Sequence, residues 1–583
     1  MWVVATAGHV DHGKSTLVRA LTGMEPDRWA EERRRGMTID LGFAWTTLPS
    51  GATVAFVDVP GHERFVPNML AGVGPVPAAL IVVAADEGWM PQSAEHLAAL
   101  HALGVRHALL AVTRTDLADP GRALRQARAE IAATSLGEVA AVAVSGTTGA
   151  GLDELRFALD QLGAALPAPS TSAPVRLWVD RCFVVRGSGT VVTGTLGAGR
   201  LRVGDELEIA GSGERVRVRG LQSLGRTCSQ VPAVARVALN LRGVAHQRLA
   251  RGEALLSPGR FHRSDCVDIR LAGDPAADLP AQLTLHVGAA AVGVRVRPLG
   301  PDTVRLRLAT ALPLRVGDRA LLRDPGRHRV TGGVTVLDVD PPPLRRRGAA
   351  AARAQLLAAM DGSPDFTGEL RRRRLVQGAR LARMGVPVQG TPLAGDWYVD
   401  PAHRDDLRAR LAAEVARHQR ENPLAAGLPV DTLCRLLGLP DRALLAPLVP
   451  APLVLRDGRV GTPSPLPAGV LRAVERIRQD FAHAPFRAPE SDLLTALGLG
   501  PREIAAAVRS GLLFRVAENV VLPPDAVEAA ARVLAGLPQP FTLSAARRAL
   551  DTSRRVAVPL LETLDRQGVT RRLPDDSRTL GGP

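Results

Sequence analysis

The feature that most constrains this chain of 583 residues is a short glycine-rich segment that contains its single lysine. Lysine and arginine together number 73, and all of them except Lys14 are arginine. Lys14 stands in Gly8-His-Val-Asp-His-Gly-Lys-Ser15, directly after an apolar run at residues 2–7. A strand, the pattern GxxxxGK[ST] and a helix in this order are typical of a phosphate-binding loop, whose backbone N–H groups surround phosphate oxygens. The planar guanidinium of arginine is too bulky for the lysine position, which explains the one lysine.

This loop predicts a nucleoside triphosphate site with Mg²⁺. We expect Lys14 to reach the β and γ phosphates and the Ser15 hydroxyl to bind Mg²⁺. The predicted nucleotide-binding residues of the loop are Gly8, Asp11, His12, Gly13, Lys14, Ser15 and Thr16. The alternative is a glycine-rich turn that only joins a strand to a helix.

A second motif follows the apolar run at residues 53–58 and reads Asp58-Val-Pro-Gly61. An aspartate at a strand end can hold Mg²⁺ through water, and Gly61 lets a backbone N–H meet the γ phosphate. Between the two motifs, Thr38 of the segment 35–40 offers a hydroxyl that would complete the Mg²⁺ shell when GTP is present. The alternative for Thr38 is an ordinary loop threonine.

Guanine recognition is predicted after two later strands of a doubly wound sheet. In Thr113-Arg-Thr-Asp116, the Asp116 carboxylate can accept hydrogen bonds from guanine N1 and N2, and Thr113 is expected to keep a hydroxyl bond. In Ser145-Gly146, the Gly146 N–H would face guanine O6. The usual patterns have NKxD at the first segment and alanine at the position of Gly146, so Thr113, Arg114 and Gly146 depart from them.

Charge is distributed unevenly along the chain, which has a net charge of +15. Residues 1–170 hold 13 basic and 18 acidic side chains, whereas residues 171–583 hold 60 and 40. The downstream excess predicts a nucleic-acid partner, although arginine codon bias can produce the same composition. No apolar run approaches the roughly 20 residues of a membrane span, and the N-terminus lacks a basic signal-peptide region, so we expect a cytoplasmic protein with no membrane partner.

The pattern along the chain predicts a multidomain fold. Short alternating strands with glycine turns follow a Pro/Ser-rich linker at 166–174 and indicate β-barrels, and three later segments repeat a helix followed by an apolar hairpin, as in winged helices. The predicted fold class is an α/β P-loop GTPase domain, two β-barrel domains and tandem α+β winged-helix domains. The predicted domain ranges are 1–168, 174–260, 261–342, 345–415, 416–468, 469–535 and 538–583.

The motifs GHVDHGKS, RGMTID and DVPGH together make residues 1–165 resemble the translational GTPases typified by elongation factor Tu. The resemblance implies that His62 positions the attacking water once the ribosome orders the switch segments. Segments at 179–194, 235–241 and 286–318 look like the second and third domains of that superfamily. The extension is similar to the bacterial selenocysteine-specific elongation factors, and residues 418–423 and 560–572 carry that likeness.

The resemblance implies a GTP-hydrolysing factor, working as a monomer with GTP/GDP and Mg²⁺, that delivers selenocysteinyl-tRNA to the ribosome at UGA codons marked by an mRNA hairpin. Asp180, Arg181 and Arg236 match the positions of the family's aminoacyl pocket. Two guanidinium groups and an orienting carboxylate would favour a selenolate over neutral serine. The alternative is an Asp-Arg pair that only structures a barrel strand.

The last predicted winged helix, residues 538–583, holds eight arginines and five acidic residues. We expect this module to bind the mRNA hairpin, although many tandem winged helices serve only as spacers. The predicted RNA-binding residues are Arg547, Arg548, Arg554, Arg555, Arg571, Arg572 and Arg578. The alternative functions are another tRNA-carrying translational GTPase and a nucleotide-switched winged-helix regulator that binds DNA.

Overall fold

The structure is a computed structural model and describes residues 1–26, 38, 40–62, 65–74, 76–327, 329–463 and 466–581. The chain divides into two compact units. The first unit contains residues 1–369 and 377–390, and the second contains residues 370–376 and 391–583. Among the described residues, no helix is both long and apolar enough to span a bilayer.

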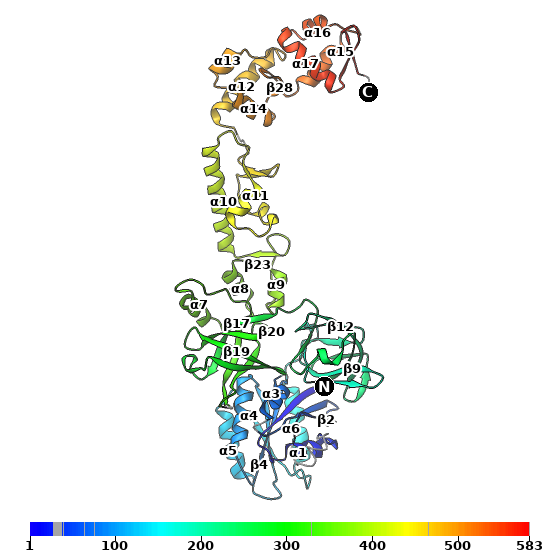
Figure 1. The fold of residues 1–583 in the computed structure, drawn as a ribbon, viewed down its shortest axis with the longest axis vertical. Coiled ribbons are helices and arrows are strands. Elements are labelled where there is room, and N and C mark those ends of the chain that lie inside the picture. The colour runs from blue at the N-terminus through cyan, green and yellow to red at the C-terminus, as the bar shows by residue number, and fades with distance from the viewer. Residues whose placement is uncertain are drawn as a thin grey trace. The chain divides into compact units, whose positions relative to one another are not determined.

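A six-stranded sheet with the order β2-β3-β1-β4-β5-β6 begins the first unit (Figure 1). β2 is antiparallel to β3, and the other neighbours are parallel. Helices α3, α4 and α5 cover one face and α1 and α6 the other, so the central strands are continuous apolar runs. The elements are β1 (Trp2–Ala7), α1 (Lys14–Thr22), β2 (Gly42–Thr47), β3 (Thr53–Asp58), α3 (Val66–Val73), β4 (Ala78–Ala84), α4 (Pro91–Ala102), β5 (His107–Thr113), α5 (Gly121–Ala132), β6 (Ala140–Ala143) and α6 (Leu152–Ala164).

An eight-stranded antiparallel sheet follows and curls around one apolar core. Its order is β7-β16-β11-β12-β15-β9-β8, with β13 paired to β12, and its end strand β7 also contacts β9. Strands β10 and β14 form a separate pair. The strands are β7 (Arg176–Trp178), β8 (Arg181–Val185), β9 (Gly189–Leu196), β10 (Arg200–Arg202), β11 (Glu206–Ile209), β12 (Arg215–Ser223), β13 (Arg226–Cys228), β14 (Gln230–Pro232), β15 (Ala235–Arg242) and β16 (Ala254–Leu256).

The next six strands form a closed barrel with the order β17-β20-β19-β18-β21-β22. They are β17 (Ser264–Gly273), β18 (Gln282–Val287), β19 (Ala290–Pro298), β20 (Thr303–Leu312), β21 (Arg319–Asp324) and β22 (Arg329–Asp338). Helix α7 (Ala349–Ala358) docks on this barrel through buried ion pairs, because the Arg353 guanidinium donates to Asp268 (2.7 Å) and Asp338 (2.6 Å). The first unit therefore continues past the predicted barrel boundary at residue 342.

The second unit contains a long helix, α10 (Pro401–Glu421). Asp400 caps its N-terminus, because its side chain accepts a hydrogen bond from the His403 N–H. The buried side chains of α10 belong to one core with β25 (Leu428–Pro429), α11 (Val430–Leu437) and the hairpin β26–β27 (Val454–Arg456 and Arg459–Gly461). The predicted boundary between residues 415 and 416 lies inside this helix. The structure moves it toward the N-terminus because α10 packs on the elements that follow it.

Two further helix–hairpin modules complete the second unit, and the buried residues of both belong to one core cluster. The hairpin β26–β27 of the preceding module follows two 3-10 turns, η4 (Arg442–Leu444) and η5 (Ala446–Leu448), where Pro447 removes a helical N–H. The elements of the two modules are α12 (Ala468–His483), α13 (Ser491–Ala496), α14 (Pro501–Arg509), β28 (Phe514–Ala517), β29 (Val520–Leu522), α15 (Ala526–Ala535), α16 (Leu543–Ala549), α17 (Arg554–Arg566), β30 (Thr570–Arg572) and β31 (Arg578–Leu580).

Candidate functional site

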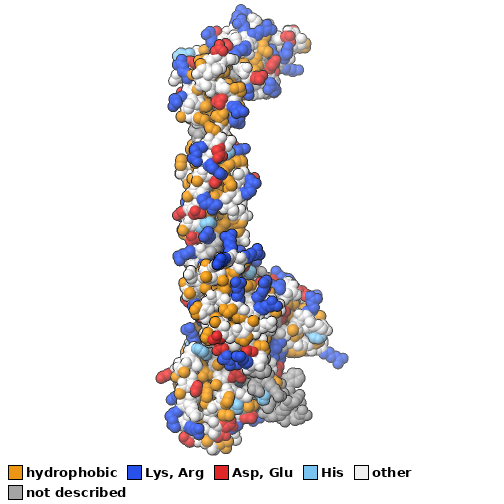
Figure 2. All heavy atoms as spheres, turned by 60° about the vertical axis from the view of Figure 1, so that its left-hand side comes forward, with side chains coloured by type: hydrophobic (Ala, Val, Ile, Leu, Met, Phe, Trp, Pro, Cys, Tyr) orange, Lys and Arg blue, Asp and Glu red, His pale blue; other side chains and the backbone are white. Residues whose placement is uncertain are grey.

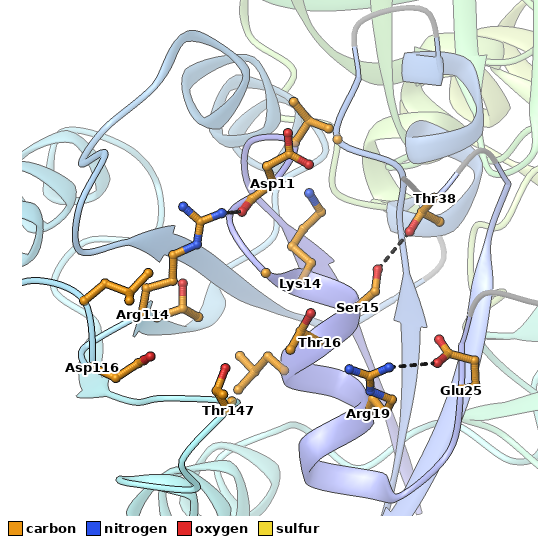
Figure 3. A pocket seen from close by; sticks show the side chains of 17 residues that line it. Asp11, Lys14, Ser15, Thr16, Arg19, Glu25, Thr38, Arg114, Asp116 and Thr147 are labelled. Atoms are coloured by element: carbon orange, nitrogen blue, oxygen red, sulfur yellow. Dashed lines mark hydrogen bonds and ion pairs between the residues drawn. The ribbon is translucent and has the colours of Figure 1, made fainter. Parts of the chain in front are cut away.

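A pocket of about 640 Å³ lies at the N-terminus of α1, where the loops after β1, β5 and β6 meet (Figure 3). Ligands of open α/β sheets bind at this end of the parallel strands. The predicted residues that line the pocket are Asp11, Gly13, Lys14, Ser15, Thr16, Thr38, Gly61, Thr113, Asp116 and Gly146. Gly8, His12, Asp58, His62 and Ser145 do not line it.

The phosphate loop requires glycine at its first position. Gly8 has φ +143°, and a Cβ atom there would lie 2.2 Å from the carbonyl oxygen of Val82. Lys14 begins α1 with a buried side chain, and its Nζ donates to the carbonyl oxygens of Gly8 (3.0 Å) and His9 (2.6 Å). The ammonium group is therefore held above the loop, at the position from which it would meet phosphate oxygens.

The three residues predicted to hold Mg²⁺ lie together. The Ser15 hydroxyl is 2.8 Å from the Thr38 hydroxyl and donates to Asp58 Oδ2 (2.6 Å), and Asp58 Oδ1 accepts from Thr6 (2.7 Å). Two hydroxyl oxygens and a carboxylate are the hard oxygen ligands that Mg²⁺ prefers, so the donor set fits this ion. Residues 35–37 and 39 of the Thr38 motif lie outside the described residues.

The backbone at Gly61 lies so close to the phosphate loop that a Cβ atom there would be 2.6 Å from both Lys14 Nζ and Val10 N. Only glycine fits this approach of its backbone to the phosphate loop. His62 follows it, half-buried, with its ring 5.9 Å from that of Phe65. The structure thus places His62 next to the pocket wall rather than in it.

The predicted base-recognition loop is hydrogen-bonded to the phosphate loop although its sequence departs from the usual pattern. The Thr113 hydroxyl donates to the His12 carbonyl oxygen (2.8 Å), and Arg114 donates to the carbonyl oxygen of Asp11. Arg114 also pairs with Asp86 (2.9 Å) and Glu87 (2.8 Å). Figure 3 shows Asp116 with Arg114 along this side of the pocket.

Two functional contacts of the phosphate loop come from α4, which the sequence did not indicate. The Gly8 N–H donates to His96 Nδ1 (3.0 Å), and the Val10 N–H donates to Gln92 Oε1 (3.0 Å). Burial lowers the pKa of His96 to about 3, so the ring stays neutral and keeps its acceptor nitrogen. Gly8 and His96 are 88 positions apart, and no local sequence pattern predicts a hydrogen bond between residues so far apart.

The three predicted aminoacyl-pocket residues also lie together. Arg236 pairs with the buried Asp180 through two N–H groups, one of them at 2.7 Å. The guanidinium groups of Arg236 and Arg181 lie 3.8 Å and 5.2 Å from the ring centre of Phe43, which precedes them by more than 130 positions. Arg181 Nε lies 3.0 Å from an Asp40 carboxylate oxygen. Asp40 and Phe43 are contacts that the sequence analysis missed.

The predicted RNA-binding arginines have different surroundings. Arg547, Arg548, Arg554 and Arg571 are exposed. Arg555 donates to backbone carbonyl oxygens of the preceding module, and Arg572 pairs with Asp576 (2.6 Å) across its own hairpin. Figure 2 shows basic side chains interspersed with acidic ones over this part of the surface.

Arg578 corrects the prediction. Its side chain is 8% exposed and donates to Asp565 at 2.9 Å. Arg578 therefore lies on the packed side of the last hairpin, where the Asp565 carboxylate balances its charge, as a buried charge requires. The structure therefore removes Arg578 from the possible RNA surface.

Comparisons with known proteins agree with this architecture. Residues 1–165 match the family described as Elongation factor Tu GTP binding domain. Residues 266–343 match Selenocysteine-specific elongation factor, beta-barrel domain, and residues 532–579 match Elongation factor SelB, winged helix. The predicted fold class, with its GTPase domain, barrels and winged helices, is confirmed.

Relatives that align over nearly their whole length are selenocysteine-specific elongation factors. The selenocysteine-specific elongation factors of Desulfomicrobium baculatum and Escherichia coli (strain K12) are 31% and 32% identical, and each alignment covers 98% of both chains. A crystal structure of the bacterial selenocysteine-specific elongation factor EF-Sec aligns over 99% of both chains with a TM-score of 0.74 and 25% identity. The alternative of a DNA-binding regulator finds no support among these matches. The chain belongs to the family of bacterial selenocysteine-specific translation elongation factors, which are translational GTPases with winged-helix domains.

Proposed function

We propose that this factor binds GTP with Mg²⁺, carries selenocysteinyl-tRNA to the ribosome at UGA codons, and holds an mRNA hairpin with its last winged helix. The observation that carries the proposal is the cluster of Arg181, Arg236 and Asp180 on the face of the barrel that meets Phe43 of the nucleotide domain. We expect one copy of the chain to carry out these steps, as a monomer in the cytoplasm.

In the nucleotide pocket, Lys14 binds the β and γ phosphates, and Ser15, Thr38 and Asp58 hold Mg²⁺, the last through water. Mg²⁺ neutralises charge on the phosphates when it is bound. The phosphate loop supplies Gly8, Asp11, His12, Gly13 and Thr16 as its backbone cradle. Asp116 and Gly146 bind the guanine, while Thr113 holds the loop of Asp116 to the phosphate loop and the buried Ser145 positions Gly146.

Hydrolysis is assigned to His62, which orients the attacking water on the ribosome. Because His62 lies outside the pocket wall, this role requires the ribosome to bring its ring toward the γ phosphate. His62→Ala should leave GTP and tRNA binding intact and slow ribosome-stimulated hydrolysis by at least about 10²-fold, the usual loss for a group that acts on a proton or water in the transition state. Single-turnover hydrolysis on programmed ribosomes measures this, and an unchanged rate contradicts the assignment.

For the aminoacyl group, a selenol is more acidic than a thiol and is an anion at neutral pH, whereas the seryl precursor is neutral. Both guanidinium groups already have a carboxylate partner, Asp180 for Arg236 and Asp40 for Arg181, so the selenolate is favoured because it adds a charge-assisted hydrogen bond that a neutral hydroxyl cannot match. Arg554, Arg555, Arg547 and Arg548 of α16–α17, with Arg571 and Arg572 of the hairpin, would contact the RNA.

The test is to identify the tRNA that copurifies with the GTP form and to measure affinity for its selenocysteinyl and seryl forms. Arg181→Ala should shrink the difference between the two affinities. Arg236→Lys tests the other arginine and keeps a positive charge beside the buried Asp180. Arg215→Ala is the matched control, because it removes an exposed arginine of the same sheet that pairs with Glu206. Equal losses for both tRNA forms would mean that the cluster only structures the barrel.

A further inference from the structure

Arg114 stands where the usual pattern of the base-recognition loop has lysine, and its guanidinium group joins three loops. Its Nη2 group donates to the Asp11 carbonyl oxygen of the phosphate loop. Its Nη1 group donates to carboxylate oxygens of Asp86 (2.9 Å) and Glu87 (2.8 Å), which lie between β4 and α4. Arg114 therefore links the loops that follow β1, β4 and β5 beside the nucleotide pocket, which Arg114 and Asp11 line and the two carboxylates do not.

Glu87 also contacts the phosphate loop directly. Its second carboxylate oxygen lies 3.5 Å from His12 Nε2. His12 is fully buried, and burial lowers the pKa of its ring to about 4, so a neutral ring meets the carboxylate here. The same side chain of Glu87 therefore contacts the base-recognition loop through Arg114 and the phosphate loop through His12.

The backbone at two of these positions needs support from its surroundings. Asp11 has φ +62° and Arg114 has φ +54°, both in the left-handed region. This conformation is unfavourable for residues other than glycine, and it persists where neighbouring contacts fix it. The hydrogen bond from Arg114 to Asp11 joins the two positions, and the two carboxylates hold the guanidinium group that donates it.

The arrangement around Arg114 suits arginine and not lysine. A guanidinium group is planar and carries its donors in a fixed fork, whereas an ammonium group is a compact charge on a flexible stem. In this fork, one nitrogen serves both carboxylates and the other serves Asp11. The carboxylates of Asp86 and Glu87 therefore give a physical reason for the departure of this chain from the usual lysine.

We propose that Asp86 and Glu87 are positioning residues for nucleotide binding, which hold Arg114 so that the base-recognition loop and the phosphate loop keep a fixed spacing. Both loops contact GTP and GDP alike, so the two carboxylates contribute equally to the affinity for either nucleotide. This inference rests on the proposed function, because it takes the pocket to bind guanine nucleotides.

Electrostatic repulsion alone predicts the opposite result. Carboxylates near the pocket repel phosphate groups, so removal of their charge would raise the nucleotide affinity, and more for GTP than for GDP. Positioning predicts a loss that is the same for both. The side chains of Asp86 and Glu87 are 32% and 34% exposed. We expect Asp86→Asn and Glu87→Gln each to weaken GTP and GDP binding by about 5-fold, the upper range for a partly exposed ion pair.

The measurement is equilibrium titration of the full chain with GTP and with GDP, together with thermal unfolding of each variant. Arg114→Met keeps the aliphatic stem, and in that background Glu87→Gln should cost no further affinity, because the two changes break one contact. Arg114→Gln repeats this cycle if the methionine variant does not fold. Arg114→Lys restores the usual residue and should still weaken both nucleotides, because an ammonium group cannot reproduce the fork.

Asp153→Asn is the control, since Asp153 forms an exposed ion pair with Arg156 in the same domain, and it should change neither affinity. Unchanged or higher affinity in the carboxylate variants overturns the inference. So does an unequal loss for GTP and GDP, an additive loss in the Arg114→Met background, or full affinity of Arg114→Lys. If the wild-type protein binds neither nucleotide, the proposed function fails instead.

Discussion

At the residue scale, the phosphate loop is fixed by contacts from outside its own sequence. His96 and Gln92 of α4 accept hydrogen bonds from two of its backbone N–H groups. Buried N–H groups without a partner are costly, so these side chains stabilise the loop in the shape that surrounds phosphate. The shape of the phosphate loop therefore depends both on glycine at position 8 and on the hydrogen bonds that His96 and Gln92 accept.

Lys14→Arg should abolish GTP binding although the positive charge is kept. The Lys14 side chain is buried and fits between two carbonyl oxygens and the backbone of Gly61, which leaves no room for a planar guanidinium. Isothermal titration with GTP and GDP measures the effect, with Arg156→Lys on α6 as the control. Normal binding and hydrolysis by the Lys14→Arg variant would be inconsistent with the phosphate-loop assignment.

His96 should make the nucleotide domain sensitive to acid. Its pKa is about 3 in the folded chain against 6.5 unfolded, because burial disfavours the charged ring. Its contribution to stability is complete above pH 6.5 and falls by up to about 1.4 kcal/mol per pH unit as the pH drops toward 3, since only the unfolded chain takes up the proton.

The variant His96→Gln keeps an acceptor for the Gly8 N–H but does not titrate. The opening free energy of α4, obtained from amide hydrogen exchange after correction for the intrinsic exchange rate, should therefore fall less between pH 6.5 and 4.5 in this variant than in the wild-type chain. His101→Gln, at an exposed position of the same helix, serves as the control. Identical pH profiles for His96→Gln and the wild type would disprove the role of His96.

The residues that line the pocket could be picked out from the sequence because they belong to local motifs. Lys14, Ser15 and Gly61 belong to short motifs whose spacing reflects one loop each. Contacts such as Arg181 with Asp40 join distant segments through tertiary packing, and nothing in a single sequence marks them. For the same reason Arg578 could not be separated from the exposed arginines before its partner Asp565 was seen.

At the element scale, the last two modules share one core instead of two. Leu560 and Leu561 of α17 belong to the same cluster as Ile477 of α12 and Ile504 of α14, and α17 also contacts β28. The sequence pattern predicted helix–hairpin segments but not their shared core, because apolar periodicity does not indicate which neighbouring element a helix packs against.

Leu560→Ala should loosen both hairpins. Leu560 is fully buried, and its truncation should cost about 2–5 kcal/mol, as for other buried leucines. Hydrogen exchange should increase together in β28–β29 and in β30–β31. Leu493→Ala on α13, at an exposed leucine of the same region, is the control. Faster exchange in β30–β31 alone would show that the modules are independent.

At the scale of the whole molecule, positive charge is concentrated after residue 170. Much of it is already neutralised within the protein, as Arg555, Arg572 and Arg578 show in the last module. The number of arginines therefore overstates the basic surface available to RNA. The exposed arginines of α16, α17 and β30 remain as the strongest candidates for phosphate contacts.

Hairpin binding by the full chain should weaken with salt, with log affinity falling against log salt by roughly 0.7 to 0.9 per phosphate contact. Arg571→Ala should lower both the affinity and this slope, because Arg571 is exposed at the edge of the last hairpin. Filter binding of UGA-containing host hairpins over a series of salt concentrations measures both quantities. Arg532→Ala on α15, outside the proposed surface, should change neither, and a loss of affinity with an unchanged slope would exclude a phosphate contact.

Lys14 carries the single ε-amino group of this chain, so the reactivity of that amine shows whether the nucleotide pocket is occupied. An acylating reagent finds only the Lys14 amine besides the N-terminus, and a lysine-specific protease has one cleavage position, within the phosphate loop. Both reactions need access to an atom enclosed between the carbonyl oxygens of Gly8 and His9 and the pocket. Intact-mass spectrometry can therefore count molecules with an occupied pocket, because they lack the second mass increment that follows acylation of the N-terminal amine.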